Sequence, residues 1–555
     1  MKSLFFAASF FLALASSSLF AQSAASDSAG VTDISNVSLN QDNPTVSINR
    51  KNKNVIVIGA ASDDMDANGM IAYTSTDQGT SWSSSRLPLP IDPNFYIYGE
   101  PSIAANDAGT FYYAYITNDG VDSGGNISIA TSSNGKNWTN STPIITNGVN
   151  FGSPDRVFIT VDNSPESFHY NRVYAVWNQY YKADSLFLKE GLYITWSDND
   201  GHTWTNPKFL GPGDDYQICR TGKKGEIYVS CSDSSGFGHE LFVSTDFGTT
   251  FTSPALSISS SFFKSYPFFT FGLDSGYTGL KGSQGFRAFP YVAFDVDLRT
   301  GRLHAVTGDY EGSLADLYYS YSDNNGTGWS TPQLVGITVQ DITSSDCFDP
   351  WVTVDQKTGE ANVLFYSSEP DPKNILTATA RVRLKDTIEG QPQILNSTFN
   401  PLVVEKTDSS TSYIGDRTMS DAFDSVYVGV WTQNRAGFID GDVFAFISYP
   451  KSAKSSVQVP IVIHSTTLWL SSPYPNPSDG KSIFLSYYIP HATHLALDLF
   501  DDVGKQVKHL CDKSISDEGT FTEEFSLSNL PAGSYIIRML TDAGQISRKL
   551  VVLGK

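Results

Sequence analysis

Cysteine, positive charge and long apolar runs are all scarce in this sequence. Four cysteines in 555 residues are too few for a disulfide framework. Lysine and arginine number 37 against 58 aspartate and glutamate residues, which gives a formal net charge of −21. No basic cluster offsets this charge, so we do not expect nucleic-acid binding, because phosphate backbones would be repelled. The only long apolar run lies at the N-terminus, which excludes a helical membrane protein.

Two of the four cysteines stand close together in the sequence. Cys219 and Cys231 flank a Gly-Lys-Lys-Gly turn, so a disulfide between them is conceivable. Their offset is not that of directly opposed residues in a strand pair, and disulfide geometry is demanding, so we do not favour the bridge. Their spacing also matches no familiar zinc site.

Strand and turn formers dominate what is present. Aromatic residues make up 13% of the chain and charged residues only 17%, with 44 glycines. This profile is poor in the residues that fill helices and favours β-structure. The apolar share of 40% can build a large core, which excludes disorder for most of the chain.

The N-terminal apolar run has the features of an export signal. Lys2 supplies a positive charge, the apolar stretch 4–15 follows, and small residues lead to a cleavage site after Ala21. We therefore predict a signal peptide over residues 1–21 and an exported protein. The alternative, a membrane-anchoring helix, is disfavoured because the stretch is short for a span.

One short motif recurs five times along the chain. In each copy an Asp or Asn follows a Ser by two residues, and a Gly and an aromatic residue come next. The copies are Ser75–Trp82, Ser197–Trp204, Ser244–Phe251, Ser322–Trp329 and the shortened Ser132–Trp138. We expect a folded hairpin turn, in which the Asp or Asn side chain bonds backbone N–H groups, the Gly takes a positive φ and the aromatic ring packs underneath.

The motif is the Asp-box, and the chain resembles the Asp-box β-propeller proteins, of which sialidases are the best known. Each copy lies in a unit of four antiparallel strands, the pattern of a propeller blade. The first pair of strands in such a unit can be found seven times along the chain. These pairs begin near Pro44, Pro101, Asp155, Tyr216, Phe289, Pro350 and Arg417. The predicted fold is therefore all-β, a seven-bladed propeller over residues 31–450. Sialidases have six blades, so a six-bladed ring is the alternative.

The last repeat has only three strands, over residues 417–423, 426–431 and 443–449. A spare strand at Val31–Leu39 precedes the first blade. Pairing this strand into the last blade would close the ring and remove two exposed sheet edges.

The end of the chain reads as a separate unit. A linker of small polar residues, 451–470, precedes Tyr474-Pro-Asn-Pro477 and alternating strands at Ile483–Ile489 and Leu495–Phe500. Residues 471–555 resemble the C-terminal sorting domain of the type IX secretion system of Bacteroidetes. The resemblance implies a small β-sandwich, passage through the type IX secretion machinery, and a secreted or cell-surface protein. An ordinary carbohydrate-binding sandwich is the alternative.

Residues just before each innermost strand converge on the mouth of a propeller's central channel. Those positions hold the carboxylates Glu100, Asp155 and Asp416 and the arginines Arg156, Arg287 and Arg417. Guanidinium groups bind carboxylates in a bidentate manner, so the cluster would suit an acidic ligand. The alternative is structural, because the acids and arginines would pair with one another.

The sialidase resemblance implies roles for these residues. Arg156, Arg287 and Arg417 would form the arginine triad that holds a sugar carboxylate. Tyr413 would be the nucleophile, and Glu100, Asp155 or Asp416 the acid or the activating base. The family's arginine motif should precede the first Asp-box, but Arg86-Leu-Pro88 follows it instead.

Two further segments bear on a ligand. Asp64, Asp66 and Asn68 form the start of an Asp-x-Asp-x-Asn-Gly calcium loop, although position twelve is Ser75 instead of Glu. Bound Ca²⁺ and a plain turn both remain open there, and no other cofactor is required. The aromatic-rich connection 255–285 is either a lid over the mouth or a plug packed on the ring.

From the sequence we expect an exported propeller that binds a glycan or a surface protein at its channel mouth. The alternative is a sialidase-like exo-glycosidase acting on a terminal acidic sugar. Neither reading needs a transmembrane anchor.

Overall fold

The computed structural model describes the chain between residues 28 and 553. Its gaps are residues 36–39, 63–68, 91–94, 119–124, 140, 146–152, 184–185, 213–215, 233–238, 253–268, 271–286, 289–290, 312–313, 336–345, 372–375, 385–386, 397, 402–413, 435–439, 450–467, 471–472, 474–477, 479, 490, 502, 517–518, 529 and 543. The described residues form strands and no helix, as the composition predicts. No helix long and apolar enough to cross a membrane occurs among them.

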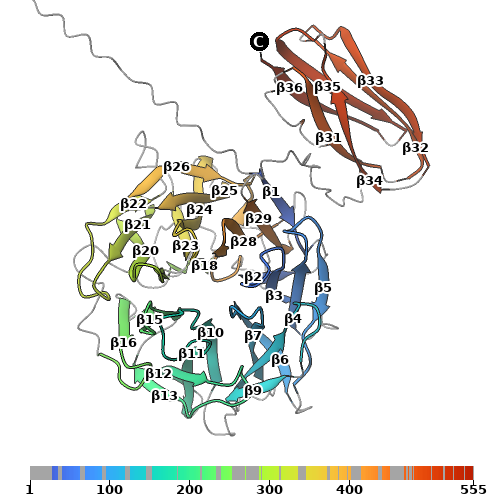
Figure 1. Ribbon diagram of the computed structural model, residues 1–555. Helices are drawn as coiled ribbons and strands as arrows, with labels where there is room; N and C mark the ends of the chain where they lie inside the picture. Colours follow the sequence, from blue (N-terminus) through green and yellow to red (C-terminus); the bar gives the residue numbers. More distant parts are fainter. Residues whose placement is uncertain are drawn as a thin grey trace, which may run out of the picture.

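Seven antiparallel sheets of three or four strands surround a common centre (Figure 1). The first three sheets follow the chain in order. They are β2 (Gln41–Ile48), β3 (Ile56–Ser62), β4 (Gly69–Ser75) and β5 (Ser83–Arg86); β6 (Tyr96–Ala105), β7 (Phe111–Asn118), β8 (Gly125–Ser132) and β9 (Thr142–Ile145); and β10 (Ser153–Val161), β11 (Val173–Ala183), β12 (Leu186–Ser197) and β13 (Lys208–Gly211).

The next three sheets repeat this meander. They are β14 (Ile218–Thr221), β15 (Ile227–Ser232) and β16 (His239–Ser244); β19 (Val292–Asp297), β20 (Arg302–Glu311), β21 (Leu314–Ser322) and β22 (Gln333–Val335); and β23 (Cys347–Val354), β24 (Ala361–Asp371), β25 (Leu376–Leu384) and β26 (Ile388–Ile394). A two-stranded pair, β17 (Phe269–Thr270) and β18 (Arg287–Ala288), lies in the connection between the fourth and fifth sheets.

The seventh sheet joins the two ends of this region. It contains β27 (Met419–Phe423), β28 (Val426–Asn434), β29 (Gly441–Tyr449) and, as its fourth strand, β1 (Ser28–Asp33). The predicted spare strand therefore exists, but its predicted range, 31–39, is wrong: pairing starts at Ser28↔Tyr449 and ends at Asp33↔Phe444. Beyond it, Ile34 N still donates to Val443 O over 2.8 Å, and Val443 N donates to Ser35 Oγ over 3.0 Å, so a side chain then takes the place of a backbone acceptor. The added strand covers the edge of β29.

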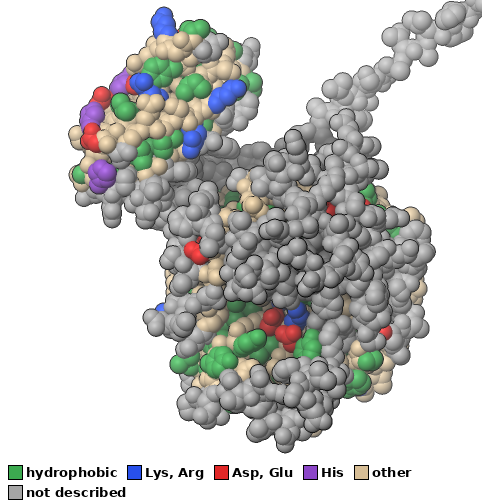
Figure 2. Space-filling view, turned by 180° about the vertical axis from the view of Figure 1, so that it is seen from behind, with side chains coloured by type: hydrophobic (Ala, Val, Ile, Leu, Met, Phe, Trp, Pro, Cys, Tyr) green, Lys and Arg blue, Asp and Glu red, His purple; other side chains and the backbone are tan. Residues whose placement is uncertain are grey.

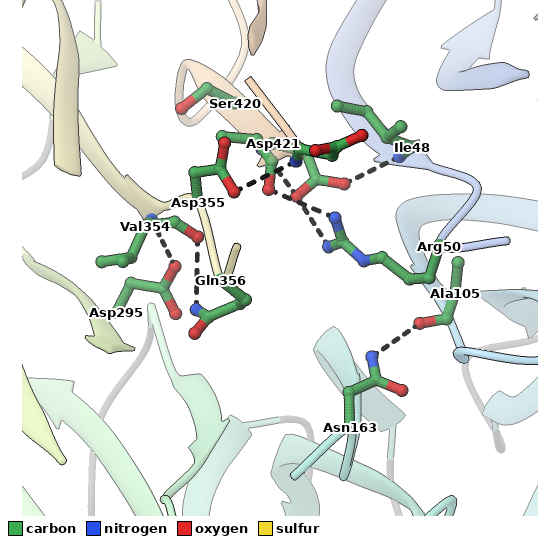
Figure 3. A network of polar contacts seen from close by, with 12 residues as sticks. Ile48, Arg50, Ala105, Asn163, Asp295, Val354, Asp355, Gln356, Ser420 and Asp421 are labelled. Atoms are coloured by element: carbon green, nitrogen blue, oxygen red, sulfur yellow. Dashed lines mark hydrogen bonds and ion pairs between the residues drawn. The ribbon is translucent and has the colours of Figure 1, made fainter. Parts of the chain in front are cut away.

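Side chains link neighbouring sheets at the end of the ring where the innermost strands turn back (Figure 3). Each bond runs from a side chain of one sheet to the backbone of the next. Asp421 accepts from Ile48 N (2.7 Å), Asn163 donates to Ala105 O (2.9 Å), Asp295 accepts from Val354 N (2.8 Å) and Asp355 accepts from Ser425 N (2.6 Å). These carboxylates and amides satisfy backbone groups that strand ends would otherwise bury without a partner.

The five repeated motifs form the predicted hairpin turn. In the first copy Ser75 Oγ donates to Asp77 Oδ1 (2.8 Å), Ser81 N donates to the same oxygen (2.9 Å), and Gly79 has φ 84°. The ring nitrogen of Trp82 donates to Gly79 O over 3.1 Å, which holds the aromatic ring beneath the turn. Equivalent serine bonds recur at Asn134, Asn199, Asp246 and Asn324.

Large aromatic side chains fill the core. Trp177, Trp351 and Trp431 are buried, with 0–1% exposure. The four cysteines are free. Cys219 lies opposite Val229 and not Cys231, which agrees with the offset argument against a bridge.

The C-terminal unit has two sheets and its own core. Its strands are β30 (Trp469–Leu470), β31 (Ser482–Ile489) and β34 (Gly519–Ser526) in one sheet, and β32 (Thr493–Phe500), β33 (Gln506–Ile515), β35 (Gly533–Thr541) and β36 (Gly544–Val552) in the other. Buried residues of both sheets, among them Leu485 and Leu497, form one hydrophobic cluster. This arrangement is a β-sandwich, and the two strands predicted there match β31 and β32.

Candidate functional site

Five sheets carry a backbone irregularity at the same place near the start of their innermost strand. The residue there has a positive φ although it is not glycine: Asn43 (50°), Glu100 (58°), Arg156 (51°), Tyr216 (65°) and Asp349 (48°). In four of these strands the pairing register also shifts at this point, which marks a β-bulge. Bulges re-aim side chains, and a positive φ at a residue such as Glu, Arg or Tyr costs on the order of 1–3 kcal/mol. Such repeated strain at one end of the ring points to a site there.

The local sequence explains part of this geometry. Pro44, Pro101 and Pro350 directly follow three of the strained residues. Proline has no N–H group, so the ladder cannot continue regularly through it. Asn and Asp tolerate the left-handed region, whereas Glu100 and Arg156 do not favour it and must be held by their surroundings.

The central contact of the site joins sheets on different sides of the ring. Arg156 Nη1 lies 2.5 Å from Asp416 Oδ2, and Arg156 Nε lies 3.8 Å from Asp155 Oδ2. The guanidinium carbon also lies 4.0 Å from the centroid of the Tyr216 ring. Arg156 and Asp416 are both buried, at 8% and 5% exposure. Asp416 N donates to Asn43 Oδ1 over 2.7 Å, so the ion pair is tied to the first sheet as well.

Arg417 is placed differently from Arg156. It is 6% exposed, and its guanidinium carbon lies 5.8 Å and 5.9 Å from the ring centroids of Phe158 and Trp351. Within the described part of the chain it makes no hydrogen bond or ion pair, and its Nε is buried without an acceptor. A buried guanidinium without an acceptor is costly, so this group is available to a ligand oxygen.

This environment strongly changes the acidity of Glu100. Burial, with the charges of Asp155 and Asp416 adding to it and those of Arg156 and Arg417 opposing it, raises the pKa of Glu100 to about 8. Its carboxyl group therefore carries a proton at neutral pH and can donate it.

Three tyrosines border these charges. Tyr98 is 62% exposed, and burial of its hydroxyl and the charges of Asp155 and Glu100 raise its pKa. Tyr291 is 1% exposed, its ring stacks on Tyr216 at 5.6 Å between centroids, and its hydroxyl has no partner among the described residues. Burial and then the charge of Asp349 raise the pKa of Tyr291 well above its usual range. The phenols of Tyr98 and Tyr291 therefore stay protonated near neutral pH.

The structure thus brings together five of the predicted residues: Glu100, Asp155, Arg156, Asp416 and Arg417. We call these five, with Asp349, the mouth cluster. Tyr413 lies outside the described residues, as do Asp64, Asp66 and Asn68. No group of three or more metal-ligating side chains occurs in the ranges described.

The remaining candidates are only partly placed. Arg287 pairs in the backbone with Thr270, and its side chain lies outside what is described. The connection 255–285 is described only at Phe269–Thr270. The sequence argument missed Tyr291, although an aromatic residue just after Pro290, near the start of an innermost strand, was a usable signal. In the space-filling view, acidic, basic and hydrophobic side chains lie together in a hollow near the middle of the ring (Figure 2).

The comparisons with known proteins identify the C-terminal unit. Residues 472–553 match the family model described as "Secretion system C-terminal sorting domain". This match confirms the predicted type IX sorting domain and indicates export and a cell-surface or secreted location. No curated protein matches the chain significantly.

Solved structures give only low similarity to the whole chain. The Hadza microbial sialidase Hz136 has 14% identity and a TM-score of 0.39, with 59% of this chain and 63% of the sialidase covered, which is less than two-thirds of that protein's length. An α-L-arabinanase of Penicillium chrysogenum has 11% identity and a TM-score of 0.31, covering 67% and 94% of the two chains. An α-L-arabinofuranosidase of Podospora anserina has 13% identity and a TM-score of 0.30, covering 65% and 94%. At these TM-scores none of the three assigns an activity.

Proposed function

We propose that the chain is an exported, seven-bladed Asp-box propeller that binds a glycan at its mouth cluster. The observation that carries this proposal is Arg417, a buried guanidinium with no acceptor among the described residues. Tyr291 adds a second buried donor without a partner, and Tyr98 adds an exposed aromatic ring beside Glu100 and Asp155.

These groups match what a sugar needs. A pyranose or furanose ring presents hydroxyl groups at its edge and C–H groups on its face. The hydroxyl groups can accept from Arg417 and Tyr291 and donate to the surrounding carboxylates, while the C–H face packs on an aromatic ring such as Tyr98.

Conventional sialidase activity is less well supported. Arg156 is already bound to Asp416 at 2.5 Å, and its Nε faces Asp155. A sugar carboxylate on Arg156 would have to displace a buried ion pair and approach several other carboxylates. A ligand without a full negative charge avoids both costs.

Glycoside hydrolysis is the second candidate, and Glu100 favours it. A carboxyl group that keeps its proton at neutral pH, beside a second carboxylate, is the combination that protonates a leaving-group oxygen. In that reaction Glu100 would act as the general acid. Asp155 would be the second carboxylate, serving as base or nucleophile.

The test is a glycan-array screen of the full chain without residues 1–21, followed by titration calorimetry with the retained glycans. We expect Arg417→Gln to abolish retention. The matched control Arg86→Gln, an exposed arginine on β5, should bind like the parent protein. Equal binding by Arg417→Gln and the parent, or no retained glycan at all, would refute the proposal.

The same glycans, incubated with the protein and analysed by mass spectrometry, separate the two candidates. Release of a terminal sugar by the parent but not by Glu100→Gln would establish the hydrolase. Retention without release, unchanged by Glu100→Gln, would leave a binding protein.

A further inference from the structure

A cavity lies among the innermost strands, away from the mouth cluster. It has a volume of about 440 Å³, and all seven innermost strands contribute to it, through residues near the ends where those strands turn back. This volume lies within the range of small-molecule sites. Its position is the end of the ring that the links between sheets hold together (Figure 3).

Two aromatic rings separate the cavity from the mouth. Phe158 and Trp351, from the third and sixth sheets, lie 6.0 Å apart between ring centroids, and both line the cavity. Arg220 also lines the cavity, with its guanidinium carbon 5.1 Å and 5.4 Å from those rings. Arg417 lies against the same two rings but does not line the cavity. The cavity and the mouth cluster are therefore distinct sites.

The charges that line the cavity are balanced. Arg50 pairs with Asp421 at 2.7 Å and Arg220 pairs with Asp295 at 2.9 Å. Each arginine keeps 16% of its side-chain surface exposed. Within the ranges that the structure describes, Arg220 Nη2 and Arg50 Nε have no acceptor, so one N–H edge of each guanidinium remains for a ligand.

This arrangement selects a class of ligand. A phosphate or carboxylate could bind the free N–H edges of the two guanidinium groups. It would then lie close to Asp421 and Asp295, whose negative charges already neutralise the two arginines and would repel it. A hydrocarbon would leave the two free guanidinium edges without acceptors. The hydroxyl groups of a neutral polyol offer acceptors to both guanidinium edges without adding a charge.

We propose that this cavity is a second binding site, which takes a neutral mono- or disaccharide. The cavity shares no polar residue with the mouth cluster. This proposal therefore does not depend on the function proposed for the mouth cluster.

Filling the cavity tests the proposal without breaking an ion pair. Ala104 lines the cavity and is partly exposed in it, so Ala104→Phe should occupy the space. The matched control is Ala108→Phe, at an exposed turn residue of the same sheet that does not line the cavity. Arg220→Lys keeps a cation beside Asp295 but removes the planar edge.

The measurement is saturation-transfer NMR and calorimetry on the full chain without residues 1–21, with xylose, glucose, cellobiose and maltose as probes and inorganic phosphate as the anionic probe. We expect at least one sugar to bind, Ala104→Phe to abolish this binding, and Arg220→Lys to weaken it about tenfold. Ala108→Phe and Arg417→Gln should leave it unchanged. Equal melting temperatures of the two phenylalanine variants would show that the loss is not unfolding.

Three outcomes would overturn the proposal. They are no binding of any of the four sugars, sugar binding that survives Ala104→Phe, and phosphate binding that Ala104→Phe abolishes. Loss of sugar binding in Arg417→Gln alone would place the bound sugar at the mouth cluster and would also refute it.

Discussion

Removing the Arg156 guanidinium should destabilise the ring, and removing the charge of Asp416 as well should restore part of the loss. The two groups are 2.5 Å apart, with side-chain exposures of 10% and 7%. In Arg156→Met, Asp416 stays buried with its main counter-charge gone. Truncating one partner of a buried ion pair costs about 3–5 kcal/mol, whereas apolar or neutral replacement of both is often close to neutral.

The prediction is therefore that Arg156→Met/Asp416→Asn unfolds less readily than Arg156→Met alone. For residues in direct contact, coupling energies of about 0.5–3 kcal/mol are usual, and a buried pair belongs at the upper end. The exposed pair Arg302 and Asp323, 2.6 Å apart with exposures of 22% and 57%, is the matched control. Arg302→Met should cost no more than about 1 kcal/mol.

Urea unfolding followed by tryptophan fluorescence is the assay. Eight of the nine tryptophans lie in the ring region, and the ninth, Trp469, belongs to β30 of the C-terminal unit, so the fluorescence signal mainly reports unfolding of the ring. Additive effects of Arg156→Met and Asp416→Asn, or a cost of Arg156→Met no larger than that of Arg302→Met, would refute the reasoning. Arg156 would then be a group held in reserve for a ligand, as the arginine-triad interpretation requires.

Three other changes have defined outcomes. The pKa of Glu100 in the folded protein is raised to about 8, so between about pH 4.5 and 8 the folded state holds a proton that the unfolded state has lost, and the parent protein should lose stability as the pH rises through this range. In thermal melts Glu100→Gln should weaken this pH dependence. The same pH dependence in the variant and the parent would contradict the raised pKa. Chemical denaturation should show that Gly79→Ala lowers the stability of the protein more than Gly201→Ala does. Both glycines have φ near 80°, so the backbone strain is similar. A Cβ atom at Gly79 would overlap Ile447, whereas one at Gly201 would lie 3.7 Å from its nearest neighbour. Deleting residues 28–35 should expose the β29 edge and lower the melting temperature by several degrees; an unchanged melting temperature would mean that β1 does not stabilise the ring.

Repetition made most of the fold predictable from the sequence. The Ser, Asp or Asn, Gly and aromatic residues of the motif form a turn through local hydrogen bonds, so the turn follows from a few neighbouring residues. The innermost strands could likewise be found from Pro44, Pro101 and Pro350. The bounds of β1 could not, because that strand is defined by its partner β29, more than four hundred residues away.

The grouping of the candidate residues was predictable from the sequence, but the contacts of each residue were not. Spacing placed Glu100, Asp155, Arg156, Asp416 and Arg417 at one end of a ring, and the structure brings them together. Arg156 and Arg417 looked equivalent in the sequence. In the structure Asp416 forms an ion pair with Arg156, whereas Arg417 lies against aromatic rings. This difference depends on contacts between sheets that are distant in the sequence, so the sequence alone could not show it.

The acidic and basic side chains at the two ends of the ring differ in their hydrogen-bond partners. At the turning end, Asp295, Asp355 and Asp421 accept backbone N–H groups of the next sheet, so their charges are committed to holding the sheets together. At the mouth, Glu100 has a strained backbone, and Arg417 keeps a donor that no described group accepts. Strain and unmet donors cost stability, and the links at the other end can offset that cost.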